Sequence, residues 1–584
     1  MIPKKIHLGE ILVEKKLITS QQLETAIQRH HVTGEKLGHV LIELGLIKEN
    51  ALLQLLCQQL NISYIDLKNY KLDLETVSTL PEFYARHYRA IVLKNTSNEL
   101  LIGMSDPEDL SAFDALNQII KRPFQVALVR EVDLLHAIDT LYRHTTEISH
   151  LAEELSEEIN QVSYDVDHLS QDVSSSDAPV VKLLQSVFED AVQMNASDIH
   201  IEPEEQALRI RQRIDGLLHE NVISQTNIAA ALTLRLKLMG RLNITEKRLP
   251  QDGRFSIKVR KKMIDVRLST LPVQFGESVV MRLLDRSQEL LTLDKIGMSE
   301  MTLKQFRHAI SFPHGLILIT GPTGSGKTST LYGMLKELNT EDNKIITVED
   351  PIEYTLPRVN QVQVRPDIDL TFANVLRSVL RQDPDIIMVG ELRDQETANI
   401  AIRAAMTGHL VLSTLHTNDA LSTVARLIDM GVESYLIASI LKAVMAQRLV
   451  RRICTNCIAD YQPSLEETVW LKGVNYINAI LKGFKKGVGC VYCHKTGYLG
   501  QIGLFELLTF NPLLVEALQK NNLIEFNKLA MSDKNFQPLI YSGLKLIGDG
   551  VTTISEIMRI VGENAVTDYN NARKDKKATA DADI

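Results

Sequence analysis

The second half of the chain alternates between short apolar runs and stretches whose apolar residues recur at helical spacing. The runs occupy residues 316–319, 345–348, 386–389 and 410–412. Apolar runs of this length are typical of strands that are buried on both faces of a parallel sheet. Residues 329–338 follow the first run and place their apolar side chains on one face of a helix. The pattern therefore predicts an α/β domain with a mostly parallel sheet.

A smaller α/β unit is predicted for residues 60–145. Its strand-like runs lie at 61–66 and 100–104, and a helix start with acidic first-turn residues follows at 105–109. These elements are short and mixed in order, so they predict a compact unit separate from the large domain.

Residues 177–290 show a third pattern, which predicts an α+β domain. A helix begins near Pro179, and residues 208–214 then alternate between apolar and polar side chains. A hairpin-rich stretch follows at 248–267. The alternating arginines form either a solvated sheet face or a basic wall against a nucleotide.

Two segments lack the periodic apolar residues that would allow them to pack into a hydrophobic core. Residues 146–176 are rich in Glu, Asp and Ser and predict a solvated, partly helical linker. The last residues, 564–584, are polar and charged and predict a disordered tail. Between them lie the domain at 177–290 and the large domain at 291–563, and residues 1–145 form the N-terminal part.

The first sixty residues contain an internal repeat. Two 24-residue units, 7–30 and 36–59, share a Leu-Gly pair near the start and a Leu-Ile pair nine residues later. Apolar residues at helical spacing predict two short helices in each unit. A duplicated helical packing module is the simplest interpretation.

The composition is typical of a globular protein, and the net charge limits the classes of partner that the chain is expected to bind. The 584 residues are 45% hydrophobic and 23% charged, with a net charge of −9. An acidic chain has no general attraction to phosphate backbones, which disfavours nucleic acid as a partner. Neither a signal peptide nor an apolar run of about 18 residues is evident. We therefore expect a cytoplasmic protein.

One motif carries specific chemistry. Residues 321–328 fit the pattern G-x-x-x-x-G-K-[ST], between an apolar strand and a helix. Backbone N–H groups of such a loop bind phosphates, Lys327 reaches the β- and γ-phosphates, and the Thr328 hydroxyl binds Mg²⁺. The motif predicts a site for ATP or GTP. The predicted nucleotide-binding residues are Gly321, Pro322, Thr323, Gly324, Ser325, Gly326, Lys327, Thr328 and Ser329.

Acidic residues and a histidine follow three of the predicted strands. Glu349 and Asp350 come after the second apolar run, and Glu391 comes after the third, where Gly390 stands in place of the usual metal-binding Asp. His416 follows the fourth run. Because carboxyl ends of parallel strands meet at one sheet edge, these groups are expected around the phosphate loop. Glu391 is the predicted acid for the metal, and Glu349 is predicted to polarise the attacking water.

Four of the five cysteines form two pairs with metal-ligand spacing: Cys454 with Cys457, and Cys490 with Cys493. Two such turns supply four thiolates, which suits a tetrahedral Zn²⁺ site. A site closed by four thiolates is structural. The alternative, disulfide pairing, is disfavoured in a cytoplasmic chain.

These motifs resemble those of the secretion ATPases, the hexameric motors of type II secretion and type IV pilus assembly. Residues 349–354 resemble the family's aspartate box, 380–394 its Walker B segment and 407–420 its histidine box. The resemblance extends from residue 1 to about 563 and is strongest to the extension motors of mannose-sensitive haemagglutinin pili. It implies a RecA-like motor domain, a PAS-like domain at 177–290 and a four-cysteine zinc subdomain at about 451–500.

The resemblance also implies partners and further site residues. Nucleotide would lie between the PAS-like domain and the motor domain, and the arginine candidates that would stabilise γ-phosphate charge are Arg213, Arg267 and Arg282. The implied partners are identical subunits in a hexamer and a platform protein of the inner membrane. The chain would then associate peripherally with that membrane.

The N-terminal repeat resembles the cyclic di-GMP-binding domain of the same family, whose units start with Arg-Leu-Gly and end with Gln. The second unit departs only at its first residue, where Lys36 replaces Arg, whereas the first unit has His7, Lys16 and His30 at three key positions. Neutral His binds phosphate more weakly than Arg, so we expect weakened binding. The candidate cyclic di-GMP residues are His7, Leu8, Gly9, His30, Lys36, Leu37, Gly38 and Gln59.

Together these features predict a Mg²⁺-dependent ATPase that drives assembly of a type IV pilus or extension of a type II secretion pseudopilus. The predicted catalytic residues are Lys327, Glu349, Glu391, His416, Arg213 and Arg267. Two alternatives remain open at this point. A nucleic-acid translocase would use the same core, and a nucleotide-responsive scaffold would bind ATP with little turnover.

Overall fold

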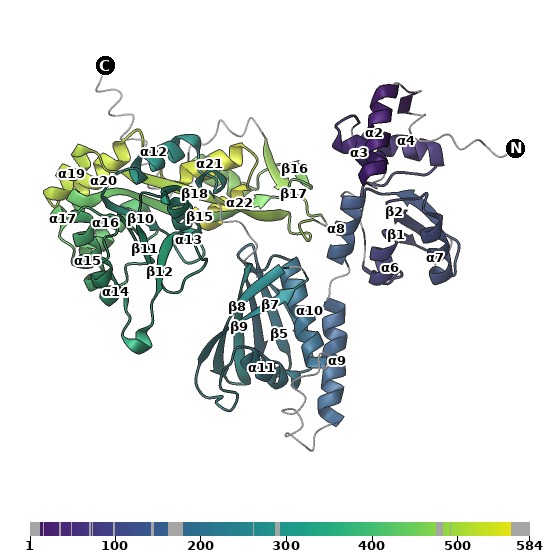
Figure 1. Ribbon diagram of the computed structural model, residues 1–584, viewed down its shortest axis with the longest axis horizontal. Coiled ribbons are helices and arrows are strands. Elements are labelled where there is room, and N and C mark those ends of the chain that lie inside the picture. Colours follow the sequence, from purple (N-terminus) through teal and green to yellow (C-terminus); the bar gives the residue numbers. More distant parts are fainter. Residues whose placement is uncertain are drawn as a thin grey trace. The chain divides into compact units, whose positions relative to one another are not determined.

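The computed structural model describes residues 12–561 except 14, 16, 34–36, 48, 69, 71, 73, 97–99, 142–144, 162–178, 261, 286–291, 475–482 and 491. The chain forms two compact units: residues 1–143 with the segment 490–495, and residues 144–489 with 496–584 (Figure 1). The predicted tail and the second half of the predicted linker lie outside the described residues.

In its described residues, the first unit has helices α2 to α4 followed by a small α/β module. The helices pack their apolar faces together around Leu12, Ala26, Leu41 and Leu55. The elements of the unit are α2 Ser20–Thr33, α3 Leu37–Glu43, α4 Glu49–Leu60, α5 Leu74–Val77, α6 Glu82–His87, β1 Ala90–Asn95, β2 Leu100–Met104, α7 Leu110–Ile120, β3 Gln125–Leu128 and α8 Glu131–Leu141.

The α/β module has a sheet of order β1-β2-β3, in which the first pair is antiparallel and the second parallel. The predicted strand at 100–104 is confirmed as β2. The predicted helix start is also confirmed, because the Asp109 side chain accepts the N–H of Ala112 and caps α7. The predicted strand at 61–66 is wrong in extent: it contributes only a bridge between Tyr64 and Leu128.

Helix α9, Thr145–Gln161, differs from the predicted linker. Its side chains Ile148, Leu151 and Leu155 are buried against α10, Pro179–Gln193. These residues recur at helical spacing among the glutamates, so the acidic face is solvated while the apolar stripe packs. The first half of the linker therefore belongs to the core of the following domain.

That domain is an antiparallel sheet of order β6-β5-β4-β9-β8-β7, on which α10 and α11 pack. The α+β prediction is confirmed, and the alternation at 208–214 is β5. The elements are β4 Asp198–Pro203, β5 Leu208–Ile214, β6 Leu217–Ile223, α11 Ile228–Met239, β7 Gln251–Val259, β8 Lys262–Val273 and β9 Gly276–Asp285.

The motor domain confirms every predicted parallel strand. Its elements are η2 Leu293–Lys295, α12 Glu300–Ile310, β10 Gly315–Thr320, α13 Lys327–Leu338, β11 Ile345–Glu349, β12 Val359–Gln363, η3 Pro366–Ile368, α14 Phe372–Val379, β13 Ile386–Val389, α15 Gln395–Met406, β14 Leu410–Leu415, α16 Ala420–Asp429, α17 Ser434–Ile440, β15 Leu441–Ile453 and β18 Tyr498–Thr509. The sheet order is β12-β11-β13-β14-β10-β15-β18, parallel except for the last pair.

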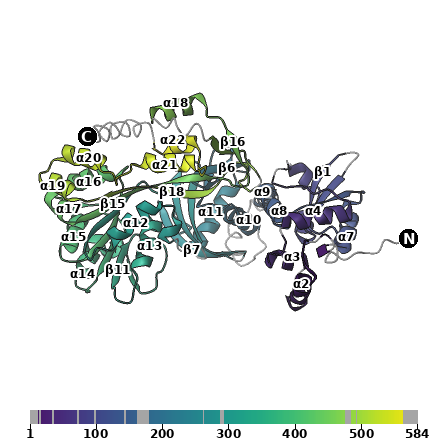
Figure 2. The same cartoon turned by 90° about the horizontal axis from the view of Figure 1, so that it is seen from above.

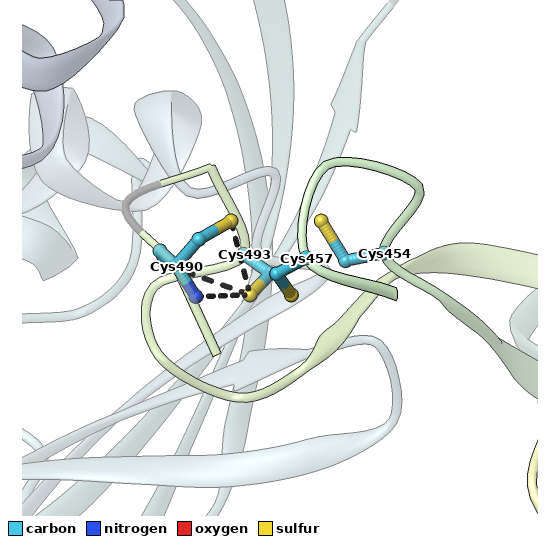
Figure 3. A group of neighbouring side chains, drawn as sticks. All are labelled: Cys454, Cys457, Cys490 and Cys493. Carbon is cyan, nitrogen blue, oxygen red and sulfur yellow. Dashed lines mark hydrogen bonds between the residues drawn. The ribbon is translucent and has the colours of Figure 1, made fainter. Parts of the chain in front are cut away.

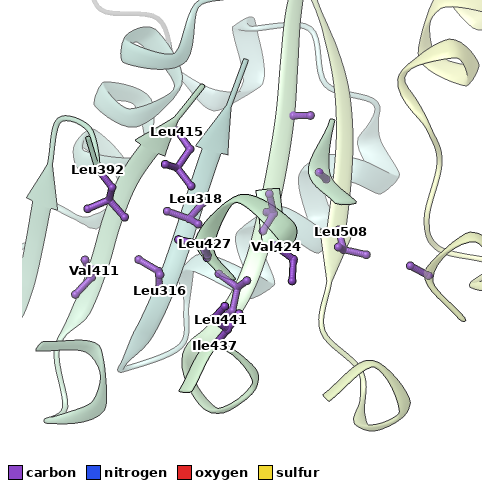
Figure 4. Close-up of a cluster of buried hydrophobic side chains, with 14 of the residues drawn as sticks. Leu316, Leu318, Leu392, Val411, Leu415, Val424, Leu427, Ile437, Leu441 and Leu508 are labelled. Carbon is purple, nitrogen blue, oxygen red and sulfur yellow. The ribbon is translucent and has the colours of Figure 1, made fainter. Parts of the chain in front are cut away.

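Helices cover both faces of this sheet, which explains why its strands are continuously apolar. On one face, α14 to α17 pack on side chains such as Leu316, Leu318 and Val411 (Figure 4). On the other face, α12 and α13 pack on Ile317 and Ile319. The loops at the carboxyl ends of the parallel strands lie beyond this packed core, where they are available for a ligand.

The remaining elements extend the β15–β18 side of the sheet. Helices α21 and α22 lie against β18 and β15 (Figure 2). A small two-stranded antiparallel sheet pairs β16 with β17 near the cysteines. The elements are β16 Ile458–Tyr461, α18 Leu465–Gly473, β17 Phe484–Gly487, α19 Pro512–Gln519, α20 Leu523–Ser532, α21 Leu539–Gly548 and α22 Ile554–Val561.

Candidate active site

The phosphate loop connects β10 to α13, as the motif predicts. Gly326 has φ of +85°, and a Cβ there would lie 2.8 Å from the Gln447 side-chain nitrogen. A Cβ at Gly321 would lie 2.4 Å from the Gln447 carbonyl oxygen. Both positions therefore require glycine because the loop lies directly on β15. The hydroxyl-bearing Thr328 and Ser329 at the start of α13 are exposed, which leaves them accessible to a ligand.

The Lys327 ammonium is held by neutral groups. Its Nζ donates to the carbonyl oxygens of Gly321 at 2.6 Å and Pro322 at 3.1 Å, and lies 3.4 Å from His416 Nδ1. The pKa of Lys327 is lowered to about 8, mainly by burial; the Glu391 carboxylate opposes this shift and the Arg448 guanidinium adds to it. A cation held by weak neutral partners can exchange them for phosphate oxygens at little cost.

Side chains from three strand ends form a chain of contacts next to the loop. His416 follows β14, and its Nε2 lies 3.5 Å from Glu391 Oε2, which follows β13. Arg393 forms an ion pair with Glu391 and lies 3.4 Å from Asp350, which follows β11. The predicted convergence of these residues is thus observed, and Lys327 joins it through His416.

Glu349 lies behind this chain of contacts and is only 4% exposed. Its Oε2 accepts the Tyr332 hydroxyl at 2.6 Å, and its Oε1 accepts Thr347 Oγ1 at 2.5 Å and Gln361 Nε2 at 3.1 Å. Both carboxylate oxygens are therefore engaged by protein donors. This placement differs from the sequence interpretation, in which Glu349 faces the attacking water.

Two residues of β15 support the loop and were missed by the sequence analysis. The buried Gln447 side chain accepts the Thr330 hydroxyl at 2.7 Å. The Arg448 guanidinium donates to the Asn418 carbonyl at 2.9 Å, in the loop that follows His416. The available signal was the Gln-Arg pair that follows the apolar run 443–446, but only the pairing of β15 with β10 places that pair under the phosphate loop.

The candidate arginines lie on the antiparallel sheet. Two of them have an acidic partner on the same sheet, and the third has one in the motor domain. Arg282 Nε lies 3.1 Å and Arg213 Nε 3.7 Å from Asp198. Arg267 forms two hydrogen bonds with Glu353, at 2.6 and 3.0 Å. Within the described residues, these pairings do not bring the three guanidiniums to the phosphate loop, so their role at the nucleotide remains a prediction.

The four paired cysteines form one buried cluster (Figure 3). Their sulfur atoms all lie within 4.8 Å of one another. Cys490 Sγ and Cys493 Sγ are 3.7 Å apart, far beyond the disulfide length of about 2.05 Å. Zinc–sulfur bonds of about 2.3 Å in a tetrahedron separate sulfurs by about 3.8 Å, so the donor set fits Zn²⁺.

The candidate cyclic di-GMP residues are only partly described. His7, Leu8, Gly9, Lys16 and Lys36 lie outside the described residues. His30 belongs to α2, Leu37 and Gly38 to α3, and the exposed Gln59 to α4. The predicted ligand site therefore remains a prediction. Within the residues that the structure describes, no helix is both long and apolar enough to cross a membrane.

Two family models match the chain. The model described as "Type II/IV secretion system protein" matches residues 173–559, and the MshEN domain model matches residues 60–148. The first match spans the antiparallel sheet, the motor domain and the cysteine cluster.

Curated relatives align along nearly the whole chain. It is 39% identical to the type IV pilus assembly ATPase PilB of Myxococcus xanthus (strain DK1622), over 94% of this chain and 98% of that protein. It is 40% identical to the type II secretion system protein E of Xanthomonas campestris pv. campestris, over 95% of this chain and 98% of that protein.

Solved structures match parts of the chain. The pilus retraction motor PilT with bound ADP is 28% identical, with a TM-score of 0.45, and the match covers 65% of this chain and 97% of that one. A structure of MshE with cdg is 40% identical, with a TM-score of 0.23, and the match covers 24% of this chain and all of that one.

Proposed function

This chain belongs to the type II/IV secretion system protein family and is an ATPase, and we propose that its hydrolysis drives extension of a type IV pilus or of a type II secretion pseudopilus. The relatives that support this proposal are named for those two processes and align over almost their full length. The observation that carries the catalytic part is the continuous set of contacts from Lys327 through His416, Glu391 and Arg393 to Asp350.

In the proposed reaction, Lys327 exchanges its two loop carbonyls for oxygens of the β- and γ-phosphates. The exposed Thr328 hydroxyl would hold Mg²⁺, which when bound would supply positive charge against the phosphates. The oxygen of a water molecule forms a bond to the γ-phosphorus, and the bond from that phosphorus to the β,γ-bridging oxygen breaks. Glu391, oriented by His416, accepts the proton of the water, and ADP leaves with the bridging oxygen beside Lys327.

We propose a structural role for Zn²⁺ in the cysteine cluster. The four buried thiols fit the ion, and closing the turns at Cys454 and Cys490 onto one ion would hold the end of β15 against the start of β18. A closed four-thiolate set leaves no position for substrate, so the ion takes no part in hydrolysis.

The proposed assembly is a homo-hexamer on an inner-membrane platform protein, regulated through the N-terminal domain by cyclic di-GMP. The family supports the ring and the platform, and the MshEN match supports the nucleotide regulator. In a ring, Arg213, Arg267 and Arg282 would approach nucleotide at the motor domain and stabilise transition-state charge.

Phosphate release by the purified full-length chain tests the ATPase part. We expect turnover that requires both ATP and Mg²⁺ and that double-stranded DNA does not stimulate. A strain that lacks the chain tests the motor part, and we expect it to lose surface pili or the secretion of folded proteins. Turnover that depends on DNA, or a strain with both normal pili and normal secretion, would contradict the proposal.

A further inference from the structure

Two adjacent acids, Glu349 at the end of β11 and Asp350 just after it, have opposite environments. Glu349 is 4% exposed and both of its oxygens accept hydrogen bonds. The Asp350 side chain is 35% exposed and lies 3.4 Å from Arg393, which also pairs with Glu391. The two side chains therefore differ in burial and in partners: Glu349 is held in the core, whereas Asp350 is accessible and lies near the arginine that also pairs with Glu391.

The donor that holds Glu349 comes from the phosphate-loop helix. Tyr332 lies on α13, which begins at Lys327, and its side chain is 1% exposed. Its hydroxyl donates to Glu349 Oε2 at 2.6 Å and accepts the backbone N–H groups of Glu353 at 3.3 Å and Tyr354 at 3.4 Å. One phenol oxygen therefore ties both ends of the segment 349–354 to the helix that carries Lys327.

Two further contacts make this connection specific for a carboxylate. Thr347 and Gln361 both donate to Glu349 Oε1, from β11 and from the neighbouring strand β12. With three donors on its two oxygens, the buried carboxylate has little capacity left to hold a water molecule. Burial and the adjacent Glu349 charge raise the pKa of Tyr332, so its hydroxyl keeps its proton.

We propose that Tyr332 is a positioning residue of the hydrolytic site, which anchors Glu349 in the core so that Asp350 is the β11 acid that faces the nucleotide. The inference rests on the proposed ATPase site. Because Tyr332 and Lys327 share one helix, the anchor sets the distance between the phosphate-binding lysine and the acids at the strand ends. Asp350 and Glu391, joined through Arg393, then form the acidic pair in front of the γ-phosphate.

The chain offers a matched control for the Tyr332 hydrogen bond. Tyr461 donates to Glu467 at 3.1 Å, and this phenol–carboxylate bond joins β16 to α18 beside the cysteine cluster. Tyr461→Phe removes the same type of interaction as Tyr332→Phe, away from the strand ends. A comparison of the two variants therefore distinguishes the general effect of losing such a hydrogen bond from the specific effect of losing the position of the acids at the strand ends.

The experiment measures kcat and KM for MgATP, together with the thermal unfolding midpoint, for both variants of the full-length chain. We expect Tyr332→Phe to lower kcat about tenfold with KM within about twofold, because bound nucleotide still reaches Lys327 while the acids lose their position. Tyr461→Phe should keep wild-type kcat. An unchanged kcat in folded Tyr332→Phe, or equal kcat losses in the two variants, would overturn the proposal.

A second pair of variants decides the question if Tyr332→Phe does not fold. Asp350→Asn should lower kcat at least tenfold more than Glu349→Gln, because only Asp350 faces the nucleotide. A larger loss in Glu349→Gln would overturn the proposal. Lys327→Ala distinguishes failure of the ATPase site from failure of the Tyr332 proposal. If Lys327→Ala retains turnover, the ATPase site is assigned to the wrong place, independently of the role of Tyr332.

Discussion

The phosphate-loop edge and the C-terminal block share strand β15 but hold their charges differently. At the phosphate loop, Lys327 contacts two carbonyls and a histidine. In the C-terminal block, formed by the end of β15 with α21 and α22, the buried Glu556 pairs with Arg451 at 2.8 Å and with Arg559 at 2.6 Å. Burial alone would raise the pKa of Glu556, but hydrogen bonds from both arginines hold it at about 2.

The difference separates two uses of charge. Where opposite charges are matched inside the chain, as at Glu556, removing one partner leaves a buried charge and destabilises the fold. Where a charge is held by neutral groups, as at Lys327, a ligand can supply the missing counter-charge. A cation held by neutral groups beside the strand ends, such as Lys327, therefore indicates a binding site for an anion. A carboxylate that is paired with arginines inside a helical block, such as Glu556, indicates a contribution to the stability of the fold.

The strongest test removes the cation on the phosphate side. Lys327→Ala should lower ATP turnover by about a thousandfold or more, because phosphate charge then lacks its main partner in the transition state. The unfolding midpoint should stay near that of the wild type because no ion pair is broken. Lys336→Ala, an exposed lysine on the same helix, is the control and should keep full turnover. Wild-type turnover in Lys327→Ala would exclude this site.

The acid at the end of β13 gives the next largest effect. Glu391→Gln should still bind MgATP but hydrolyse it about a hundredfold more slowly, since phosphate contacts persist while the proton acceptor is lost. Single-turnover measurements and a nucleotide-binding titration check this. Glu396→Gln changes an exposed acid on α15 and is the control. If Glu349→Gln stops turnover and Glu391→Gln does not, the assignment of the two acids is reversed.

The cysteine cluster tests the stability side of the comparison. We expect one Zn²⁺ per chain by elemental analysis of protein purified without chelator. Cys490→Ser should remove the ion and lower the free energy of unfolding by about 2–5 kcal/mol, because metal binding contributes to folding. Cys57→Ser changes a half-buried thiol in α4 and should retain the ion. A chain without bound metal would refute the zinc assignment.

Two buried glutamates predict opposite pH dependence. The folded pKa of Glu556, about 2, is below the unfolded value, so its stabilisation is present above about pH 4.5 and is lost as pH falls toward 2. Among the residues that the structure describes, Glu506 accepts only the backbone N–H groups of Ala420 and Leu539, and full burial raises its pKa to about 7. Its contribution is therefore present below about pH 4.5 and is lost as pH rises through 7.

Unfolding free energies measured from pH 3 to pH 8 check these signs. Glu556→Gln should destabilise the chain by about 3 kcal/mol at pH 7 and by less at pH 3. Glu506→Gln should gain stability relative to the wild type, on the order of 1–3 kcal/mol, as pH rises from 4.5 to 8. Parallel pH profiles for the two variants would show that matched and unmatched burial do not differ here.

The smallest expected effect concerns the N-terminal repeat, where His7 stands in place of the charged Arg of the related cyclic di-GMP-binding domains. Cyclic di-GMP should bind the full-length chain weakly and about tenfold more tightly at pH 6 than at pH 8, since histidines gain charge as pH falls through about 6.5. His7→Arg together with His30→Gln should tighten binding. Isothermal titration decides: tight binding by the wild type, or no gain in the double variant, would contradict the prediction.

Local patterns were sufficient for much of this protein. The phosphate loop, the parallel strands of the motor domain and the paired cysteines depend on short-range geometry: glycine conformation, continuous apolar runs and ligand spacing. The phosphate loop, each strand and each cysteine pair span only a few residues, so the sequence determined them directly. It also placed the acids at strand ends, since parallel strands bring their carboxyl ends to one edge.

The tertiary structure decided which side chains face the ligand. Glu349 ends β11 and Asp350 lies in the bend that follows, and their order in the sequence does not say which of the two enters the core. Tyr332 and Gln361, on other elements, make that choice by engaging Glu349. Likewise, the burial of the Leu151 stripe of α9 depends on its packing against α10. Such outcomes depend on contacts between residues that are distant in sequence, and a local sequence pattern cannot predict the energies of those contacts.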